Sequence, residues 1–413
     1  MPSFLYDIAT TLGARMFAMI GPFAVSVMTA RVLGPEERGR YFLILALAQI
    51  GAQIANLGLP SSNTYLVVNH RERVGPLMAN SLLVAFTVAP LVTLVIAVAF
   101  GWPQRLGLGT ATGEALGPLA LGAVLISPMM LLSLYVNNMA LGIGRVRLFN
   151  ELTIAYSLIA VAVAAIIAGI GGSVGLFLAG TAIALVIPTI PGAWSVLVGH
   201  RDQFRLDRDL FRVGVTYAVK AYLATMFGFI MTRVGVFALQ YHGNLEEVGQ
   251  FSVAMQLADG LTMLPATIGI LLFPKLMRIE SHRRGPAMWR TFWGIAAVML
   301  VTLVIAGVLA PWIVPLVFGL PFARAALLTQ ALLPSVLLLS LVSVVSQYLA
   351  AEGFPRIQVY AWLAGLLMQA GLSYWLAGKW GGMGVSLAMA ISYALVFALL
   401  LFETMFRKSG RAG

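Results

Sequence analysis

Two basic residues lie at matching positions inside long apolar segments. Arg15 is seven residues into the segment 8–32, and Lys220 is seven residues into the segment 213–241. At 1.5 Å per helical residue, each lies roughly 10 Å from the start of its segment. A charge at the middle of a membrane helix costs about 2.5–3.5 kcal/mol, which makes it a functional candidate. Two cations at one depth indicate an anion site suited to phosphate; the alternative is that each side chain snorkels to the headgroups.

Two further charged residues fall inside apolar segments. Arg233 lies well inside 213–241, and Asp259 lies near the middle of 248–272. Opposite charges on consecutive helices can neutralise one another, so one hypothesis is a structural ion pair. The other is function, with Arg233 as a further substrate contact and Asp259 as a proton or sodium site.

The elements that carry these residues are predicted to be membrane helices. The chain is 60% hydrophobic and only 10% charged, whereas soluble domains carry roughly 25% charged residues. A spanning helix needs about 20 apolar residues. Segments of that kind are predicted at 8–32, 40–59, 76–100, 115–142, 149–170, 173–198, 213–241, 248–272, 288–318, 325–351, 358–376 and 383–405. The fold class is therefore an all-α integral membrane protein with twelve transmembrane helices.

The second half of the sequence repeats the first. The pattern Glu-Glu-x-Gly-x-aromatic occurs at 36–41 and again at 246–251, and a glycine-rich pattern occurs at 171–175 and 381–384. Both repeats have the same offset of 210 positions, which indicates an internal duplication. We expect two pseudo-symmetric six-helix bundles, and because six is even, both enter the membrane in the same direction.

Basic residues predict the topology. Of the 26 Lys and Arg, seventeen lie on the side that also holds both termini, and six lie on the other side. The positive-inside rule therefore places both termini in the cytoplasm. The predicted organisation is an N-terminal half at 1–199, a cytoplasmic linker at 200–212 and a C-terminal half at 213–413.

Several classes of protein are disfavoured by the sequence. The formal net charge of +11 is explained by topology and anionic lipid, so no nucleic-acid partner is expected. Cysteine is absent, which excludes thiolate chemistry. No phosphate-binding Gly-x-x-x-x-Gly-Lys-Ser/Thr loop and no His-Glu-x-x-His motif occur. An enzyme, a cofactor and a resident metal are therefore not expected.

With these residues assembled, the chain resembles the bacterial polysaccharide flippases. These belong to the multidrug/oligosaccharidyl-lipid/polysaccharide exporter superfamily. The resemblance is carried by Ala30-Arg-Val-Leu-Gly-Pro-Glu-Glu-Arg-Gly-Arg-Tyr41, by Asn56-Leu-Gly-Leu59 and by Glu247-Val-Gly-Gln-Phe-Ser-Val-Ala254. Leu272-Phe-Pro-Lys-Leu276 and Gly381-Gly-Met-Gly384 complete the order of motifs. Twelve helices fit the O-antigen type of flippase.

The resemblance implies a V-shaped bundle around a cationic cavity that alternates between cytoplasm and periplasm. The implied cargo is an oligosaccharide on undecaprenyl pyrophosphate, as in O-antigen and lipopolysaccharide assembly. Arg15, Lys220 and Arg233 are the substrate-binding candidates, and Asp259 is the candidate for H⁺ or Na⁺ coupling. The implied location is the bacterial cytoplasmic (inner) membrane, with polysaccharide polymerase and assembly proteins as partners.

Two alternatives remain open. A multidrug or organic-ion antiporter of the same superfamily would need an acidic cavity, whereas the apolar segments hold three cations and about one carboxylate. A membrane polymerase or ligase acting on lipid-linked sugars would need a large external loop. None is predicted by these segment boundaries.

Overall fold

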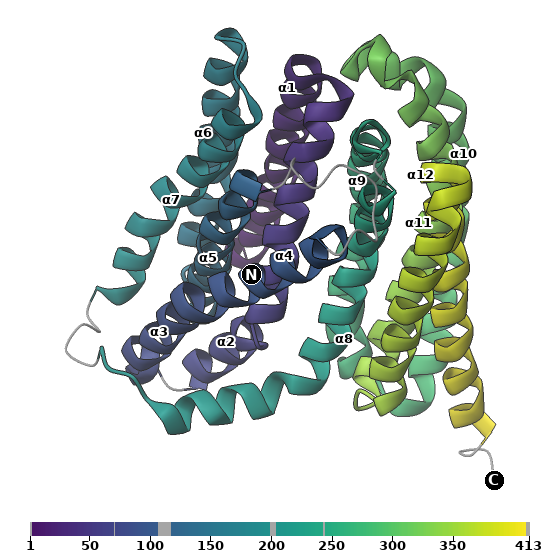
Figure 1. Cartoon of the computed structure of the whole chain (residues 1–413). Coiled ribbons are helices and arrows are strands. Elements are labelled where there is room, and N and C mark those ends of the chain that lie inside the picture. Colours follow the sequence, from purple (N-terminus) through teal and green to yellow (C-terminus); the bar gives the residue numbers. More distant parts are fainter. Residues whose placement is uncertain (1, 70, 106–116, 199–203, 243, 410–413) are drawn as a thin grey trace. The chain divides into compact units, whose positions relative to one another are not determined.

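The computed structural model describes residues 2–69, 71–105, 117–198, 204–242 and 244–409. Those residues form helices and no strand (Figure 1). A helix satisfies its own backbone hydrogen bonds, which is what a chain of this hydrophobicity needs in a lipid environment. The predicted all-α fold is confirmed for the described residues.

The described chain forms two compact units, Met1–Tyr222 and Leu223–Gly413. In the first unit, α5 (Gly117–Gly142) contacts α1, α2, α3, α4, α6 and α7 and supplies much of the core. Tyr135 and Met139 of α5 are fully buried. The helices of this unit are α1 (Pro2–Ala55), α2 (Leu59–Asn69), α3 (Val74–Leu83), α4 (Ala89–Arg105), α5, α6 (Val146–Gly169) and α7 (Val174–Leu197), with two short elements, η1 (Arg71–Arg73) and η2 (Val84–Val88).

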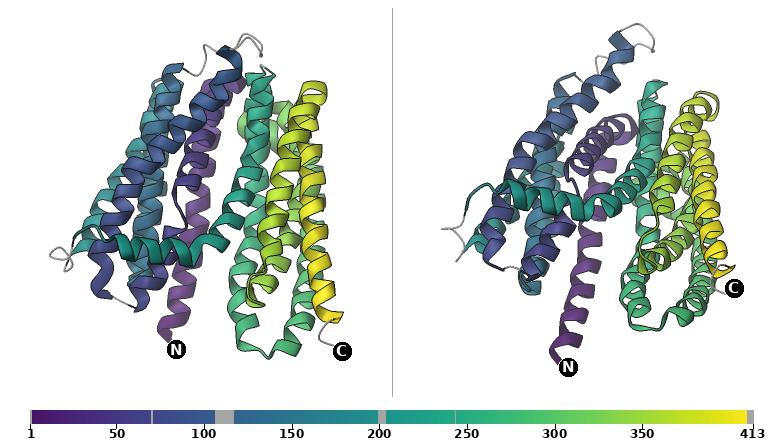
Figure 2. Two further views of the ribbon diagram at one scale, coloured as in Figure 1. Left: turned by 60° about the horizontal axis from the view of Figure 1, so that its bottom comes forward. Right: turned by 90° about the horizontal axis from the view of Figure 1, so that it is seen from below.

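In the second unit, α11 (Ala323–Ala351) contacts α9, α10 and α12. The helices involved are α8 (Arg208–Tyr241), which crosses from the first unit into the second, and α9 (Leu245–Arg278), α10 (Ser281–Phe318), α11 and α12 (Arg356–Ser409), with the short η5 (Leu320–Phe322). Figure 2 shows α9 and α10 as a hairpin joined by a short turn.

The helix bounds recur at the offset of the sequence repeat. Val146, which begins α6, and Arg356, which begins α12, are 210 positions apart. Gly171 ends the α6 segment with φ 66°, and Gly381, again 210 positions later, breaks α12 with φ 56°. A positive φ strains any residue with a side chain, so glycine is the residue that suits both breaks. The duplication therefore extends from motifs to backbone conformation.

Among the described residues, the number of helices that could span a membrane is smaller than the predicted twelve. In the described residues, nine helices are long and apolar enough to cross a membrane, or ten if the bent pair Ile20–Ala55 and Leu59–Val68 is one span. Much of the difference arises because α1 and α12 each run through a break, at Gly34 and at Gly381. At 1.5 Å per residue, a helix of 54 residues is roughly 80 Å long, far more than one bilayer requires.

The predicted linker overlaps the start of α8. This helix begins at Arg208, rather than at 213 as predicted, and the border between the compact units falls after Tyr222. Residues 199–203 of the linker region lie outside the described residues. The division into 1–199, 200–212 and 213–413 stays a prediction.

Candidate functional site

Lys220 lies on the part of α8 that belongs to the first unit. Gly214 and Ala218, on one face of this segment, are buried against α2 and the turn before it. A Cβ added at Gly58, in that turn, would lie 2.6 Å from the Ala218 Cβ. The close approach therefore requires glycine at position 58, where φ is also positive (76°).

The break between α1 and α2 holds α8 through a hydrogen bond. The chain leaves the helix at Asn56–Gly58, and Leu57 has a φ of 53°. A helix end leaves carbonyl groups without their usual partners. The Tyr222 hydroxyl donates to the Ile54 carbonyl oxygen at 2.5 Å, and the Tyr135 hydroxyl donates to that of Asn56 at 3.2 Å. Tyr222 thus fixes α8 two residues after Lys220.

The neighbouring face of this segment of α8 carries a cation beside a stacked pair of tyrosines. Tyr217 and Lys220 are three positions apart and therefore lie on the same face of the helix. The Tyr217 ring stacks on Tyr65 of α2, with centroids 4.4 Å apart and planes within 12°. Tyr65 and Tyr217 are 48% and 58% exposed, and Lys220 is exposed. Among the described residues, no carboxylate lies within ion-pair distance of the Lys220 ammonium group.

The site residues that were predicted from the sequence do not include Tyr65 or Tyr217. Tyr217 could have been found, because it is one helical turn from Lys220. Tyr65 could not, because nothing in the sequence places α2 beside α8. We call Tyr65, Tyr217 and Lys220 the Lys220 cluster.

The predicted partnership of Lys220 with Arg15 stays a prediction. Arg15 lies on α1, but side chains up to residue 19 are outside those that the structure describes. Both residues fall within the first compact unit, Met1–Tyr222.

Arg233 and Asp259 are brought together in the second unit. A guanidinium nitrogen of Arg233 lies 3.0 Å from a carboxylate oxygen of Asp259, and the two side chains are 12% and 49% exposed. The guanidinium group also lies 5.5 Å from the centroid of the Phe229 ring, within cation–π range. The ion pair that the sequence suggested is therefore present, while Lys220 belongs to the other compact unit.

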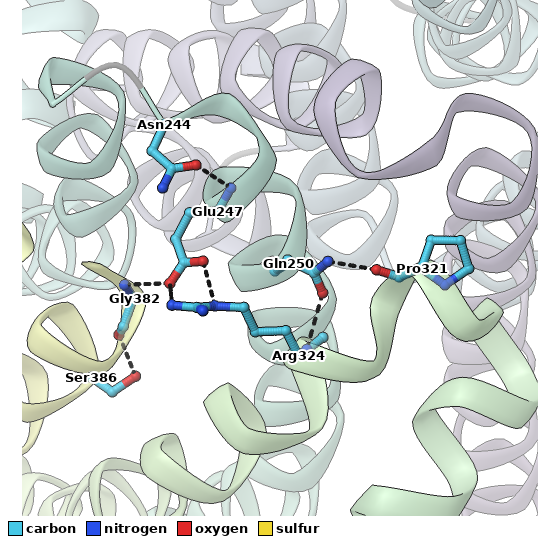
Figure 3. A network of polar contacts seen from close by, with 8 residues as sticks. Asn244, Glu247, Gln250, Pro321, Arg324, Gly382 and Ser386 are labelled. Carbon is cyan, nitrogen blue, oxygen red and sulfur yellow. Dashed lines mark hydrogen bonds and ion pairs between the residues drawn. The ribbon is translucent and has the colours of Figure 1, made fainter. Parts of the chain in front are cut away.

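A second polar centre, the Glu247 network, ties three helices together in the second unit (Figure 3). The Glu247 side chain is only 4% exposed and pairs with Arg324 at 2.7 Å. It also accepts a hydrogen bond from the backbone N–H of Gly382 at 2.8 Å. One carboxylate therefore joins the start of α9, the start of α11 and the break in α12.

The neighbouring Gln250 extends this network. Its amide donates to the Pro321 carbonyl oxygen at 2.6 Å and accepts from the Ala325 N–H at 3.0 Å. Asn244 caps α9 by accepting from the Glu247 N–H at 2.8 Å. Both ends of the Gln250 amide and the side-chain oxygen of Asn244 thus have partners.

Arg38 performs a comparable task in the first unit. It is 3% exposed, although residue 38 falls between the predicted apolar segments 8–32 and 40–59. Its guanidinium group donates to the Ser26 carbonyl oxygen at 2.6 Å, to the Ser26 hydroxyl at 2.8 Å and to the Thr29 hydroxyl. These bonds bridge the break at Gly34, so Arg38 holds the two parts of α1 together.

With this geometry described, comparison with known proteins decides the family. Residues 4–280 match the profile of the family described as polysaccharide biosynthesis protein. That match covers more than half of the chain. The chain belongs to this polysaccharide biosynthesis family. No protein of curated function matches it.

Solved structures with the same fold are transporters and flippases. The chain is similar to a lipid II flippase MurJ in an inward closed conformation, with a TM-score of 0.75 and 14% identity over 97% of this chain and 87% of that one. An inward-facing multidrug resistance MATE family transporter of the MOP superfamily gives a TM-score of 0.75 and 15% identity over 95% of both chains.

A MATE transporter in its outward-facing conformation gives a TM-score of 0.64 and 14% identity over 98% of this chain and 96% of the other. At such identities the comparison shows the fold alone. The chain therefore has the fold of these flippase and transporter structures, and its long apolar helices indicate a multi-pass membrane protein.

Proposed function

We propose that this protein is a flippase for lipid-linked oligosaccharide repeat units. The observation that carries the proposal is the match of residues 4–280 to a polysaccharide biosynthesis family, in a chain that has the fold of a lipid II flippase. A glycan and a pyrophosphate cannot cross hydrocarbon unaided, because their polar groups would lose water without new partners. The protein would carry them through by alternating access while the polyprenyl tail stays in lipid.

The Lys220 cluster has the chemistry that such a cargo needs. An ammonium group is a point charge that binds phosphate. A stacked tyrosine pair adds an apolar face with hydroxyl groups at its rim, which suits the face of a sugar ring. We place the pyrophosphate at Lys220 and the first sugar against the exposed Tyr65–Tyr217 pair, with Arg15 as a second cation.

Transport in vesicles would test this assignment. We expect Lys220→Gln to slow transbilayer movement of undecaprenyl pyrophosphate-linked oligosaccharide by about 10- to 100-fold, since one charge-assisted hydrogen bond contributes about 1.5–3 kcal/mol. Arg15→Gln should act in the same direction. The measurement is the access of a membrane-impermeant sugar-modifying enzyme to lipid loaded in the inner leaflet.

Lys379→Gln is the matched control, because Lys379 is also an exposed lysine but lies on α12. Its activity should equal that of the wild type. Transport that is normal in Lys220→Gln, Arg15→Gln and the double variant would reject the site but not the function. Absence of lipid-linked oligosaccharide transport by the wild-type protein would reject the function.

A drug or organic-ion antiporter is the second candidate, because a MATE transporter gives the same TM-score as the flippase. The charges favour the flippase. An antiporter for organic cations would need an acidic cavity, whereas the Asp259 carboxylate already forms an ion pair with Arg233. Efflux of organic cations from the same vesicles, without movement of lipid-linked sugar, would make the antiporter the better assignment.

Ion coupling is proposed at Asp259, and an exchange of charges would test it. We expect Asp259→Asn to abolish the dependence of transport on an imposed H⁺ or Na⁺ gradient, because the amide cannot ionise. The exchanged variant Arg233→Asp/Asp259→Arg restores an ion pair without restoring the carboxylate at 259. If the exchange restores both stability and gradient dependence, Asp259 is a structural partner of Arg233 and not a coupling residue.

The proposed setting follows from the same reasoning. We propose that this protein acts in the bacterial inner membrane, because its proposed cargo moves from the cytoplasmic to the periplasmic leaflet. Both termini would lie in the cytoplasm, as the distribution of basic residues predicts. The partners would be the polysaccharide polymerase and other assembly proteins that receive the cargo.

A further inference from the structure

A groove with apolar walls lies between α9 and α10 in the second unit. Its volume is about 280 Å³, just below the range of about 300–1,000 Å³ that is usual for ligand pockets. Pro265 and Ile268 form the α9 side, and Gly294, Ile295 and Val298 lie on the α10 side. The hydroxyl of Thr291, also in the lining, is occupied because it donates to the Ala287 carbonyl oxygen at 3.0 Å.

Gly294 keeps this groove open. A Cβ built at this glycine would meet no atom within 4 Å, so the space above it is unfilled. Val298, one turn further along the same row, is 50% exposed. The groove therefore runs along the surface of α10 and is accessible from the side.

Two exposed cations stand at one end of the groove. Arg290 precedes Gly294 by four positions and Val298 by eight, so all three lie in one row of α10. Lys275 follows Ile268 by seven positions, two turns along the same face of α9. Both cations therefore lie at the end where α9 finishes and α10 begins.

These two cations have no carboxylate partner among the described residues. Their neighbours differ: Arg284 pairs with Glu352 at 3.3 Å, and Arg283 lies 3.8 Å from Glu280. Lys275 and Arg290 thus provide positive charge directly beside an apolar groove. Anionic phospholipid has the complementary parts.

Tryptophans place this end of the groove at the membrane surface. Trp289 and Trp293 flank Arg290 in sequence, and Trp293 is 66% exposed. Tryptophan favours the headgroup level of a bilayer. Arg290 would thus meet lipid phosphate, while Val298, roughly 12 Å further along the helix, would meet acyl chain.

We propose that this groove binds one anionic phospholipid of the leaflet nearest Lys275 and Arg290. One acyl chain lies over Gly294 between α9 and α10, and the phosphate lies between the two cations. This proposal is independent of the transported cargo.

Native mass spectrometry of the full chain would test it after reconstitution in equal amounts of phosphatidylglycerol and phosphatidylcholine. We expect one retained phosphatidylglycerol on the wild type and its loss from Gly294→Leu, because leucine fills the groove. The matched control is Gly371→Leu, an exposed glycine of α12 that also has nothing within 4 Å of an added Cβ. Leucine is a better helix former than glycine, so both variants should fold.

The charge variant gives a second, independent readout. Arg290→Gln/Lys275→Gln should lose the preference for phosphatidylglycerol by about fivefold per cation, since each basic residue near the surface contributes about 1 kcal/mol. Arg147→Gln, a 93%-exposed cation of the first unit, should change nothing. Equal retention of both lipids by the wild type, or unchanged retention by Gly294→Leu, would overturn the proposal. If Gly294→Leu does not fold, the charge variant decides.

Discussion

Glu247→Ala is expected to unfold at a markedly lower temperature than the wild type, with a loss of about 2–4 kcal/mol. Removing one partner of a buried ion pair is costly because it leaves the other groups unsatisfied. Here the group left without a partner is the Gly382 N–H, which is buried and which donates to Glu247 at 2.8 Å. Arg324 is 57% exposed and can turn to water, so the loss should not reach the largest values known for buried pairs.

Two other glutamates, Glu246 and Glu37, give matched controls for this effect. Glu246 directly precedes Glu247 and is exposed, so Glu246→Ala should change the unfolding temperature little. Glu37 is the repeat equivalent of Glu247, and it is 42% exposed in a local pair with Arg40; such exposed pairs contribute about 0–1 kcal/mol. Thermal unfolding in detergent, followed by circular dichroism, would rank the three. Equal melting of Glu247→Ala and Glu246→Ala would show that the network does not hold the helices.

The fold could be predicted from the sequence because its main signals are local. Apolar segments of membrane length and the repeat at an offset of 210 are visible without tertiary information, and both agree with the helices observed. The breaks were harder to place. The helix predicted at 40–59 ends at Ala55, because Leu57 and Gly58 adopt positive φ. Asn56 and Gly58 are turn residues and could have indicated this end.

The sites were predicted less completely, because charge alone does not reveal burial. Arg233 and Asp259 carry opposite charges on consecutive helices, so the sequence could suggest that they form an ion pair. Arg38 and Arg324 lie between predicted apolar segments, so the segment boundaries place both of them in loops. Ser26 lies on the other side of the break at Gly34 from Arg38, and Glu247 lies on a different helix from Arg324, so the local sequence indicates neither contact. Tyr65 escaped detection for the same reason.

The symmetry of the repeat also has limits that the sequence does not show. Both halves carry a glutamate pair before the second helix, yet only Glu247 is buried in an ion pair that spans helices. In the first half, the buried charge at this turn is Arg38, and its repeat equivalent is the apolar Val248. The two halves have therefore acquired different polar centres at this turn: Arg38 links the two parts of α1, whereas Glu247 links α9 to α11 and α12.

Arg38→Ala should be among the most destabilising single substitutions in the first unit, with a loss of about 3–5 kcal/mol. The guanidinium group makes three hydrogen bonds to two residues of the preceding helix, at Ser26 and Thr29. Hydrogen bonds that involve a charged group contribute about 1.5–3 kcal/mol each, although their contributions do not add fully. Losing them removes the link across Gly34 and leaves a cavity beside the Ser26 hydroxyl.

Graded substitutions would separate the hydrogen bonds from the bulk of the side chain. Arg38→Lys keeps the charge but loses the planar fork, so it should fall between wild type and Arg38→Ala. Arg38→Met fills the space without hydrogen bonds and should recover only the packing part of the loss. Arg40→Ala is the control two residues away, where the side chain is 28% exposed and pairs with Glu36 and Glu37. If Arg38→Ala and Arg40→Ala melt at the same temperature, the bonds of Arg38 contribute no more than a surface ion pair, and the break at Gly34 is held by helix packing alone.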